Sequence, residues 1–271
     1  MATIEHLTSH FGFHSTPFTC ELRVEEGFVD ELFSEPLRHL HATVDKRMSA
    51  ALVAPAGAGK TFLLRALAAR LPETRYRLNY VKVTDLSKRD LCREMARAVG
   101  AEPAGSYPLL VRRLQERFAE HLDTDGRRPV LIIDEAHDMR PEVLSLLRIL
   151  TNFEMDSRLV VSIVLAGQPG LAKMLRMPIL EDVLHRLTHF ATLRLLSRQE
   201  TSRYVEHRCR IAGAATTPFD PGALAALYEI GRGNLRATNQ LALKGLEIGH
   251  EAECAVVDAN HITHARAMLC P

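Results

Sequence analysis

Short apolar runs alternate with segments in which apolar residues recur at helical spacing, from about residue 35 to residue 196. The strand-like runs are the start of 49–61, 76–83, 130–135, 159–167 and 189–196. The helical segments are 35–47, 61–70, 87–99, 106–122, a stretch after Pro141, and 180–187. Strands that alternate with helices in this way are typical of an α/β domain with a parallel sheet.

The pattern changes at residue 197, after which we find helical segments alone. Ser197 and Glu200 form a capping-box sequence at the start of 198–212. The later helices are one opened by Asp220 and Pro221, 234–249, and one from Asp258. We therefore predict an N-terminal arm over 1–34 with residues 10–22 extended, an α/β domain over 35–196, and a small all-helical domain over 197–271.

A loop of small residues follows the first apolar run and ends in Gly59, Lys60 and Thr61. In a phosphate-binding loop the backbone N–H groups surround the β-phosphate, the lysine reaches the β- and γ-phosphate oxygens, and the hydroxyl ligates Mg²⁺. The helix that follows would point its positive N-terminal end at the phosphates. Ala54 stands where this motif has its first glycine. The predicted nucleotide-binding residues are Ala54, Pro55, Ala56, Gly57, Ala58, Gly59, Lys60, Thr61 and Phe62.

A second motif, the apolar run 130–135, ends in two carboxylates, Asp134 and Glu135. Asp134 is expected to join Thr61 in holding Mg²⁺, and Glu135 to polarise the water that attacks the γ-phosphate. An ordinary strand and turn explains either motif alone, whereas the two together favour an ATP- and Mg²⁺-dependent site. Gln168 follows the next strand, so we interpret it as a γ-phosphate sensor or, with equal weight, as a turn residue.

Composition excludes several classes of protein. The net charge of +1 neither requires nor excludes an acidic partner, so a nucleic-acid role must come from local patches. The five cysteines, Cys20, Cys92, Cys209, Cys254 and Cys270, are widely spaced, which argues against a disulfide framework and a zinc site. His261 and His264 are interpreted as solvated or capping residues. Because no apolar run approaches the ~18 residues of a membrane helix, we expect a cytoplasmic protein without a membrane partner.

The combination of both phosphate motifs, a polar residue after a later strand and a helical lid resembles the AAA+ ATPases. Three segments resemble the ExeA/GspA-like branch, which is similar to transposon-encoded ATPase regulators. They are FGFHSTPF at 11–18, LSRQETSRYVEHRCRIAG at 196–213 and GRGNLRATNQLALKGL at 231–246. The resemblance implies an ATP hydrolase that assembles into a ring or helical filament, with each nucleotide buried between subunits.

By this resemblance two arginines act on the nucleotide. Arg236 matches a sensor residue at the start of a lid helix, and Arg186 matches an arginine finger that acts on the neighbouring subunit. A surface ion pair is the alternative for either residue. Leu235 departs from the family, which usually has proline before the sensor arginine, and the membrane helix and wall-binding segment of the secretion ATPases are missing.

The second departure favours a regulator of DNA transposition that binds duplex DNA without strong sequence preference and recruits a transposase. Lys82, Lys88 and Arg89 are the predicted DNA contacts, close to Arg75 and Arg77, although ordinary solvated charges explain them equally well. The alternative functions are a secretion-associated ATPase that acts on protein partners and a scaffold that binds ATP with little turnover.

Overall fold

The computed structural model describes residues 4–19, 21–28 and 31–269, which form two compact units. The first unit contains the N-terminal residues to Asp30, the short stretch Ala56–Gly59 and the chain from Arg194 onward. The second unit contains Glu31–Pro55 and Lys60–Leu193. The domain boundaries predicted from the sequence remain a prediction.

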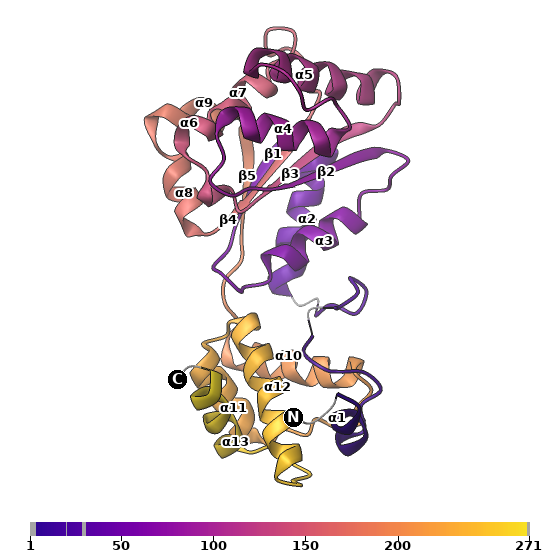
Figure 1. The fold of residues 1–271 in the computed structure, drawn as a ribbon, viewed down its shortest axis with the longest axis vertical. Helices are drawn as coiled ribbons and strands as arrows, with labels where there is room; N and C mark the ends of the chain where they lie inside the picture. Colours follow the sequence, from indigo (N-terminus) through magenta and orange to yellow (C-terminus); the bar gives the residue numbers. More distant parts are fainter. Residues whose placement is uncertain (1–3, 20, 29–30, 270–271) are drawn as a thin grey trace. The chain divides into compact units, whose positions relative to one another are not determined.

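The second unit is built on a parallel sheet (Figure 1). Its strands are β1 (Ser49–Val53), β2 (Tyr76–Lys82), β3 (Arg128–Asp134), β4 (Ser162–Gly167) and β5 (Leu187–Thr192). They lie in the order β2-β3-β4-β1-β5, and every neighbouring pair is parallel. The three central strands are buried almost throughout, which explains why they read as continuous apolar runs in the sequence. The predicted α/β fold with a helical C-terminal region is confirmed.

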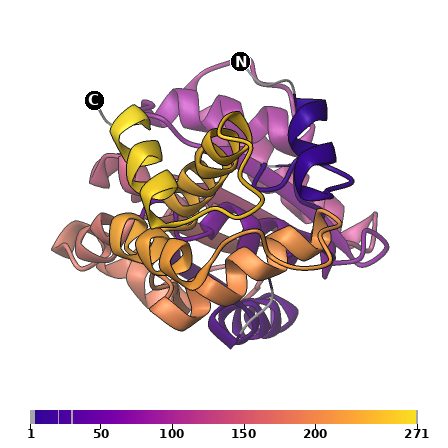
Figure 2. The same ribbon diagram turned by 90° about the horizontal axis from the view of Figure 1, so that it is seen from below.

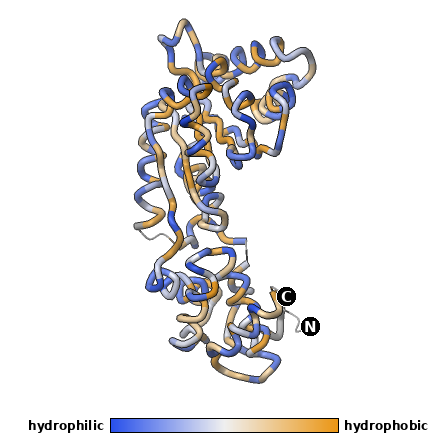
Figure 3. Tube along the Cα trace, turned by 90° about the vertical axis from the view of Figure 1, so that its left-hand side faces the viewer, coloured by the Kyte–Doolittle hydropathy of each residue, from blue (hydrophilic) through white to orange (hydrophobic). Residues whose placement is uncertain are grey.

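Helices connect the strands of this unit. They are α2 (Glu31–Asp45), α3 (Lys60–Ala69), α4 (Lys88–Val99), α5 (Tyr107–Asp123), α6 (Pro141–Leu144), α7 (Leu146–Leu150), α8 (Pro169–Leu175) and α9 (Glu181–Arg186), with the short 3₁₀ helices η1 (Ala136–Asp138) and η2 (Pro178–Leu180). Helices α4 and α5 pack together through fully buried side chains, including Met95 and Phe118. Figure 3 shows hydrophobic residues concentrated along the strands that these helices cover.

Local signals set the ends of these helices well. Ser87 caps α4 by accepting a hydrogen bond from the N–H of Asp90, as the sequence predicts. Gly100 ends α4 with φ of 74°, a left-handed conformation that glycine adopts without strain. The predicted positions of α3, α4 and α5 are therefore confirmed to within one or two residues.

Four predicted elements differ from the structure by more than this. Helix α2 begins at Glu31, four residues before the predicted start at residue 35 and inside the predicted arm, and it ends at Asp45. The helix after Pro141 is two short helices, α6 and α7, because Ser145 closes the first and starts the second. Strand β4 begins at Ser162 and not at residue 159, since Leu159 is 48 % exposed. Strand β5 covers Leu187–Thr192, so it begins two residues earlier than predicted and ends before residue 193.

The first unit consists of helices (Figures 1 and 2). They are α1 (Ile4–Phe11), α10 (Arg198–Ile211), α11 (Pro221–Gly231), α12 (Leu235–Glu251) and α13 (Ala259–Leu269), the last four coloured orange to yellow. Helix α13 packs against α11 and α12, and its Ile262 is fully buried. Gly245 permits this approach because a Cβ there would lie 2.6 Å from Ile262 Cδ1.

The N-terminal arm is only partly extended, which corrects the prediction. Residues His10 and Phe11 end helix α1, whereas the described residues from Gly12 to Phe28 form no helix or strand. The rings of Phe13 and Phe18 are buried, and the arm is bonded to the end of α10 through His14, whose N–H donates to Ala212 O at 2.7 Å. Burial of these aromatic side chains thus orders a part of the arm that forms no helix or strand among its described residues.

The capping box at Ser197 gives a testable contribution to stability. Glu200 accepts hydrogen bonds from both Nη atoms of Arg194, at 2.7 and 2.8 Å, and from the Ser197 N–H at 2.7 Å. These bonds, those from Arg194 above all, lower the pKa of Glu200 to about 2. Because the pKa of Glu200 in the folded state lies below its ordinary value of 4.5, this stabilisation is complete above that pH and is lost as the pH falls toward 2.

We therefore expect Glu200→Gln to lower the free energy of unfolding by about 1–2 kcal/mol at pH 7 and by less at pH 3. Urea unfolding at the two pH values measures the difference. Glu206→Gln is the matched control, since Glu206 is exposed on the same helix. An equal loss of stability at both pH values would contradict the role of the Glu200 carboxylate.

Candidate active site

The loop between β1 and α3 continues the sheet before it turns. Ala54 is fully buried and its N–H donates to Gly167 O at 3.0 Å, so this residue extends β1 by one ladder bond and has no need of glycine. Gly57 and Gly59 have φ of 74° and 94°, which residues with a side chain rarely adopt. The loop therefore keeps glycine where its backbone conformation requires it.

Lys60 begins α3 and is 8 % exposed. Its Nζ donates to Glu135 Oε2 at 2.7 Å and lies 3.0 Å from Asp134 Oδ1. Asp134 is only 2 % exposed, so this ammonium group is the counter-ion of a buried carboxylate. The structure thus brings together Lys60, Asp134 and Glu135, three residues that the sequence assigned separately to one site.

Tyr80 is part of this cluster, although our sequence analysis did not identify it. Its hydroxyl donates to Asp134 Oδ2 at 3.1 Å from the adjacent strand β2. Tyr80 is 46 % exposed, and the partial burial of its hydroxyl, followed by the negative charge of Asp134, raises the pKa of Tyr80 to about 12, so it remains a donor at neutral pH. Tyr80 could have been identified only from the pairing of β2 with β3, which the pattern of apolar residues does not reveal.

Glu135 has φ of 57°, an uncommon left-handed conformation for a residue with a side chain. Its N–H donates to Asp134 Oδ1 at 2.8 Å, and its carbonyl accepts from Asp138 N at 2.9 Å to start η1. Such backbone outliers are often found at functional sites, where neighbouring contacts maintain the strain. Here the turn directs the Glu135 carboxylate toward Lys60.

Gln168 follows β4 directly and is the N-cap residue of α8, without a side-chain capping bond. Strand β4 lies between β1 and β3, and Gly167 pairs with Val53. Gln168 therefore lies at the edge of the sheet where β1 and β3 also end. Its assignment as sensor or turn residue remains open.

Arg186, the last residue of α9, forms an ion pair. Its Nη2 donates to both carboxylate oxygens of Asp156, at 2.8 and 2.9 Å, and its Nε is buried without a hydrogen-bond partner among the described residues. Asp156 follows Glu154 and Met155 in a run of three residues with positive φ. The predicted finger is thus held by a turn of unusual backbone conformation.

The remaining predicted residues lie on helix ends and strand ends. Arg236 is exposed in the first turn of α12, where the Asn234 side chain caps the helix. Asn234 Nδ2 also donates to Ala56 O at 2.7 Å, a contact within the first unit. Lys82 and Lys88 are exposed at the end of β2 and the start of α4, and Arg89 donates to Gly105 O at 3.0 and 3.2 Å. Their DNA-binding role remains a prediction.

The ligand set for a divalent ion is compatible with Mg²⁺. Asp134 supplies a carboxylate and Thr61, exposed in the first turn of α3, supplies a hydroxyl. No group of three or more His, Cys, Asp or Glu side chains that would hold a metal occurs among the described residues. Mg²⁺ commonly takes one or two protein oxygens and completes its shell with water and substrate phosphates. The residues therefore fit a metal that binds together with the nucleotide.

Phe62, the last of the predicted nucleotide-binding residues, packs its ring edge-on against Phe33, with ring centroids 5.8 Å apart.

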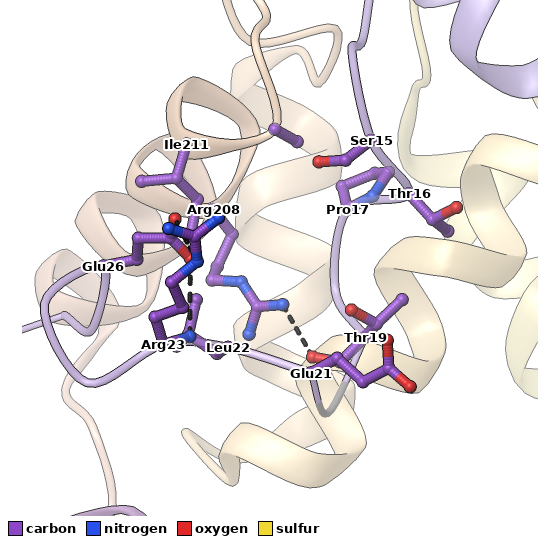
Figure 4. Close-up of a pocket in the computed structure, with 11 residues that line it drawn as sticks. Ser15, Thr16, Pro17, Thr19, Glu21, Leu22, Arg23, Glu26, Arg208 and Ile211 are labelled. Carbon is purple, nitrogen blue, oxygen red and sulfur yellow. Dashed lines mark hydrogen bonds and ion pairs between the residues drawn. The ribbon is translucent and has the colours of Figure 1, made fainter.

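A cavity of about 610 Å³ lies between the N-terminal arm and α10. Figure 4 shows the residues that line it. Arg208 points toward it from α10, is 4 % exposed, and donates to Thr19 O at 2.8 Å and to the Tyr204 hydroxyl at 3.1 Å. Its guanidinium also lies over the Phe18 ring, 5.8 Å from the centroid. Arg208 therefore anchors the arm to α10. A single arginine in an amphipathic segment does not predict this role.

Cys92, Cys209 and Cys254 are free thiols, whereas Cys20 and Cys270 lie outside the described residues. His261 Nδ1 lies 2.6 Å from Asp258 Oδ1, in agreement with the capping interpretation. In the described part of the chain, none of the helices has the length and apolar character needed to cross a bilayer.

Comparison with known proteins places this site in a family. Residues 43–175 match the family model described as an AAA domain. The chain is also 32 % identical over 244 residues to the general secretion pathway protein A of Aeromonas hydrophila, covering 88 % of this chain and 44 % of that protein. The chain belongs to the ExeA/GspA-like branch of the AAA+ family. It spans less than half the length of this curated relative.

Solved structures show the same fold at low identity. The Cdc6p protein of Pyrobaculum aerophilum matches with a TM-score of 0.74 and 16 % identity, covering 93 % of this chain and 70 % of that one. The ORC1 protein of Aeropyrum pernix, solved in complex with DNA, matches with a TM-score of 0.68 and 19 % identity, covering 90 % and 67 %. The RuvB Holliday junction branch migration motor of Thermotoga maritima matches with a TM-score of 0.55 and 16 % identity, covering 88 % and 67 %.

The cluster around Lys60 gives a prediction that needs no nucleotide. Lys60→Met should lower the free energy of unfolding of the nucleotide-free AAA+ chain by about 2–3 kcal/mol, because the buried Asp134 carboxylate loses its cation. Chemical denaturation measures this loss, and Lys60→Met combined with Asp134→Asn should recover part of it. Lys82→Met, at an exposed lysine, is the control. Equal stability of Lys60→Met and the wild type would show that the cluster is not an ion-pair network.

Proposed function

We propose that this chain hydrolyses ATP in a Mg²⁺-dependent reaction. The observation that carries the proposal is the Lys60 ammonium group, which lies within 3.0 Å of carboxylate oxygens from both Asp134 and Glu135, next to a loop with two left-handed glycines. A lysine, a buried carboxylate and a second carboxylate at the end of a strand are the groups that phosphoryl transfer requires. No other cluster described above combines them.

Each residue has a separate task in this reaction. Lys60 exchanges its carboxylate partners for the β- and γ-phosphate oxygens when the nucleotide binds, and Asp134 and Thr61 hold the metal ion. Bound Mg²⁺ would neutralise charge on the phosphoryl oxygens. Release from Lys60 leaves Glu135 free to orient and polarise the attacking water. The water oxygen bonds in line to the γ-phosphorus as the bond to the bridging oxygen of ADP breaks, and Glu135 accepts the proton that the water loses.

The catalytic assignment of Glu135 is tested by Glu135→Gln. An amide neither carries the negative charge nor accepts the proton of water, so turnover should fall about 10²-fold or more while ATP affinity remains within a few-fold of the wild type. Phosphate release and equilibrium binding of a fluorescent ATP analogue measure the two effects. Unchanged turnover in Glu135→Gln would exclude Glu135 as the residue that activates water.

The proposal includes self-assembly into a ring or filament with ATP. Arg186 would contact the nucleotide of a neighbouring subunit, and Arg236 would couple the helical domain to the nucleotide in the same chain. The ion pair of Arg186 with Asp156 supports an arginine that is ordered at the surface before assembly. An arginine supplied in trans raises turnover by roughly 10³-fold or more in related phosphoryl transfers, so activity should increase with protein concentration.

We further propose that the assembled protein binds duplex DNA and regulates transposition by recruiting a transposase. The exposed positions of Lys82 and Lys88, together with the likeness of the fold to an ORC1 protein solved with DNA, support this step. Phosphate contacts by lysine and arginine give affinity that depends little on base sequence.

The pair Lys88→Glu and Arg89→Glu tests the DNA contact. Reversal of two charges should weaken binding to a duplex at least about tenfold at low salt, with ATP affinity unchanged. Lys173→Glu with Arg176→Glu is the matched control, because these residues are exposed in the last turn and at the C-cap of α8 and undergo the same charge change. Equal DNA affinity of both variants and the wild type, measured by fluorescence anisotropy, would exclude Lys88 and Arg89 from the interface.

A second function, an ATPase that acts on protein partners in secretion, is favoured by the identity of 32 % to the general secretion pathway protein A. The two functions differ in their response to DNA. Steady-state turnover and particle size, measured with ATP in the presence and absence of long duplex DNA, discriminate them. Stimulation and DNA-dependent assembly favour transposition, and indifference to DNA favours secretion.

A further inference from the structure

His137 lies beside the proposed catalytic carboxylate in an unusual state. Its Nδ1 is 3.5 Å from Glu135 Oε2, is buried, and has no hydrogen-bond partner among the described residues. Its Nε2 lies 3.4 Å from Asp138 Oδ1, so the imidazole ring is located between two carboxylates. A buried polar atom without a partner costs stability, which makes such atoms rare unless they have a role.

The backbone around His137 fixes the position of the ring. Residues 136–138 form η1, which begins directly after the left-handed Glu135 and is closed by the Met139 N–H. Gly167 at the end of β4 allows this turn to approach, because a Cβ there would lie 3.2 Å from His137 N and 3.0 Å from Leu171 Cδ2. The ring is therefore held next to Glu135 by the fold and not by a bond of its own.

Within the described chain, Lys60 and His137 are the two side chains within ion-pair distance of the Glu135 carboxylate. Lys60 already donates to Oε2 at 2.7 Å, and His137 Nδ1 lies 3.5 Å from the same oxygen without a hydrogen bond to it. If Lys60 moves to the phosphates of ATP, Oε2 loses its donor. His137 Nδ1 is then the group nearest to replace it, and needs a shift of only a few tenths of an ångström to reach hydrogen-bond distance.

We propose that His137 is a positioning residue, which donates from Nδ1 to Glu135 when ATP has taken Lys60 and so orients the carboxylate toward the attacking water. This inference rests on the proposed ATP hydrolysis. It assigns the nucleotide-dependent change at Glu135 to an exchange of donors, Lys60 in the free protein and His137 in the complex. His137 itself touches neither the nucleotide nor the water.

Three substitutions separate this role from packing. His137→Leu keeps the bulk of the side chain and removes both nitrogens, His137→Asn keeps a donor near the Nδ1 position, and His137→Gln extends its amide toward the Nε2 position. We expect His137→Leu and His137→Gln to lower kcat by about 10²-fold, as misplacement of a reacting group does, with KM and ATP affinity within about twofold of the wild type. His137→Asn should recover most of kcat.

His137→Leu should have no further effect on single-turnover hydrolysis in the Glu135→Gln background, because both changes disrupt one unit. His264→Leu, an exposed histidine of α13, is the control, and thermal unfolding reports whether each variant folds. If His137→Leu does not fold, the comparison of His137→Asn with His137→Gln decides.

If the wild type hydrolyses ATP and all three His137 variants have the same kcat as each other, the role of His137 is overturned and the proposed function stands. A parallel rise in KM, or an equal loss of kcat in the Glu135→Gln background, would also overturn the role of His137. A wild-type protein that hydrolyses no nucleoside triphosphate would overturn the proposed function and this inference together.

Discussion

The Lys60 ammonium group, shared by Asp134 and Glu135, is the interaction on which the site depends. Asp134 is 2 % exposed and Lys60 is 8 % exposed, so neither charge is well solvated, and each is stable in its position because of the other. The same buried arrangement is readily disrupted when a more highly charged partner enters. The phosphates of a nucleoside triphosphate offer Lys60 more negative charge than a carboxylate does. Binding would therefore release Glu135 at the moment that water must be activated.

The parallel sheet makes this cluster possible. Strands β1, β3 and β4 are adjacent. The phosphate loop begins directly after β1, the carboxylate pair spans the end of β3, and Gln168 follows β4. Groups far apart in sequence thus meet at one edge because parallel strands end together. Tyr80 joins from β2 for the same reason, since β2 runs beside β3 in register. Its hydroxyl adds a donor to Asp134 that does not compete with Lys60 for the same oxygen.

Much of the fold could be predicted from the sequence because buried central strands and capped helices have strong local signals. Ser87 and Gly100 bound α4 by bonds made within a few residues, and the Ser197 capping box is likewise local. Leu159 misled the prediction of β4, because an apolar residue outside a strand has the same pattern as one inside it. The break between α6 and α7 at Ser145 and the helix α1 were also missed, since packing overrides weak propensity in short segments.

The residues of the site that belong to the two phosphate motifs could be predicted from the sequence. Lys60, Asp134 and Glu135 each occur in a pattern with a chemical reason, whereas His137 and Tyr80 contact the cluster through backbone geometry and strand pairing that no spacing rule encodes. Arg186 was predicted by resemblance, but its ion pair with Asp156 depends on a turn with positive φ that the sequence does not reveal.

Equilibrium binding of ATP to the purified chain, with Mg²⁺ and with EDTA, tests the central claim most directly. In this account Lys60 leaves two carboxylates for the nucleotide, and Asp134 and Thr61 hold the metal. We therefore predict saturable binding of one nucleotide per chain, which Mg²⁺ strengthens and which Lys60→Met abolishes. Absence of binding to any nucleoside triphosphate, or binding indifferent to Lys60→Met, would contradict the account.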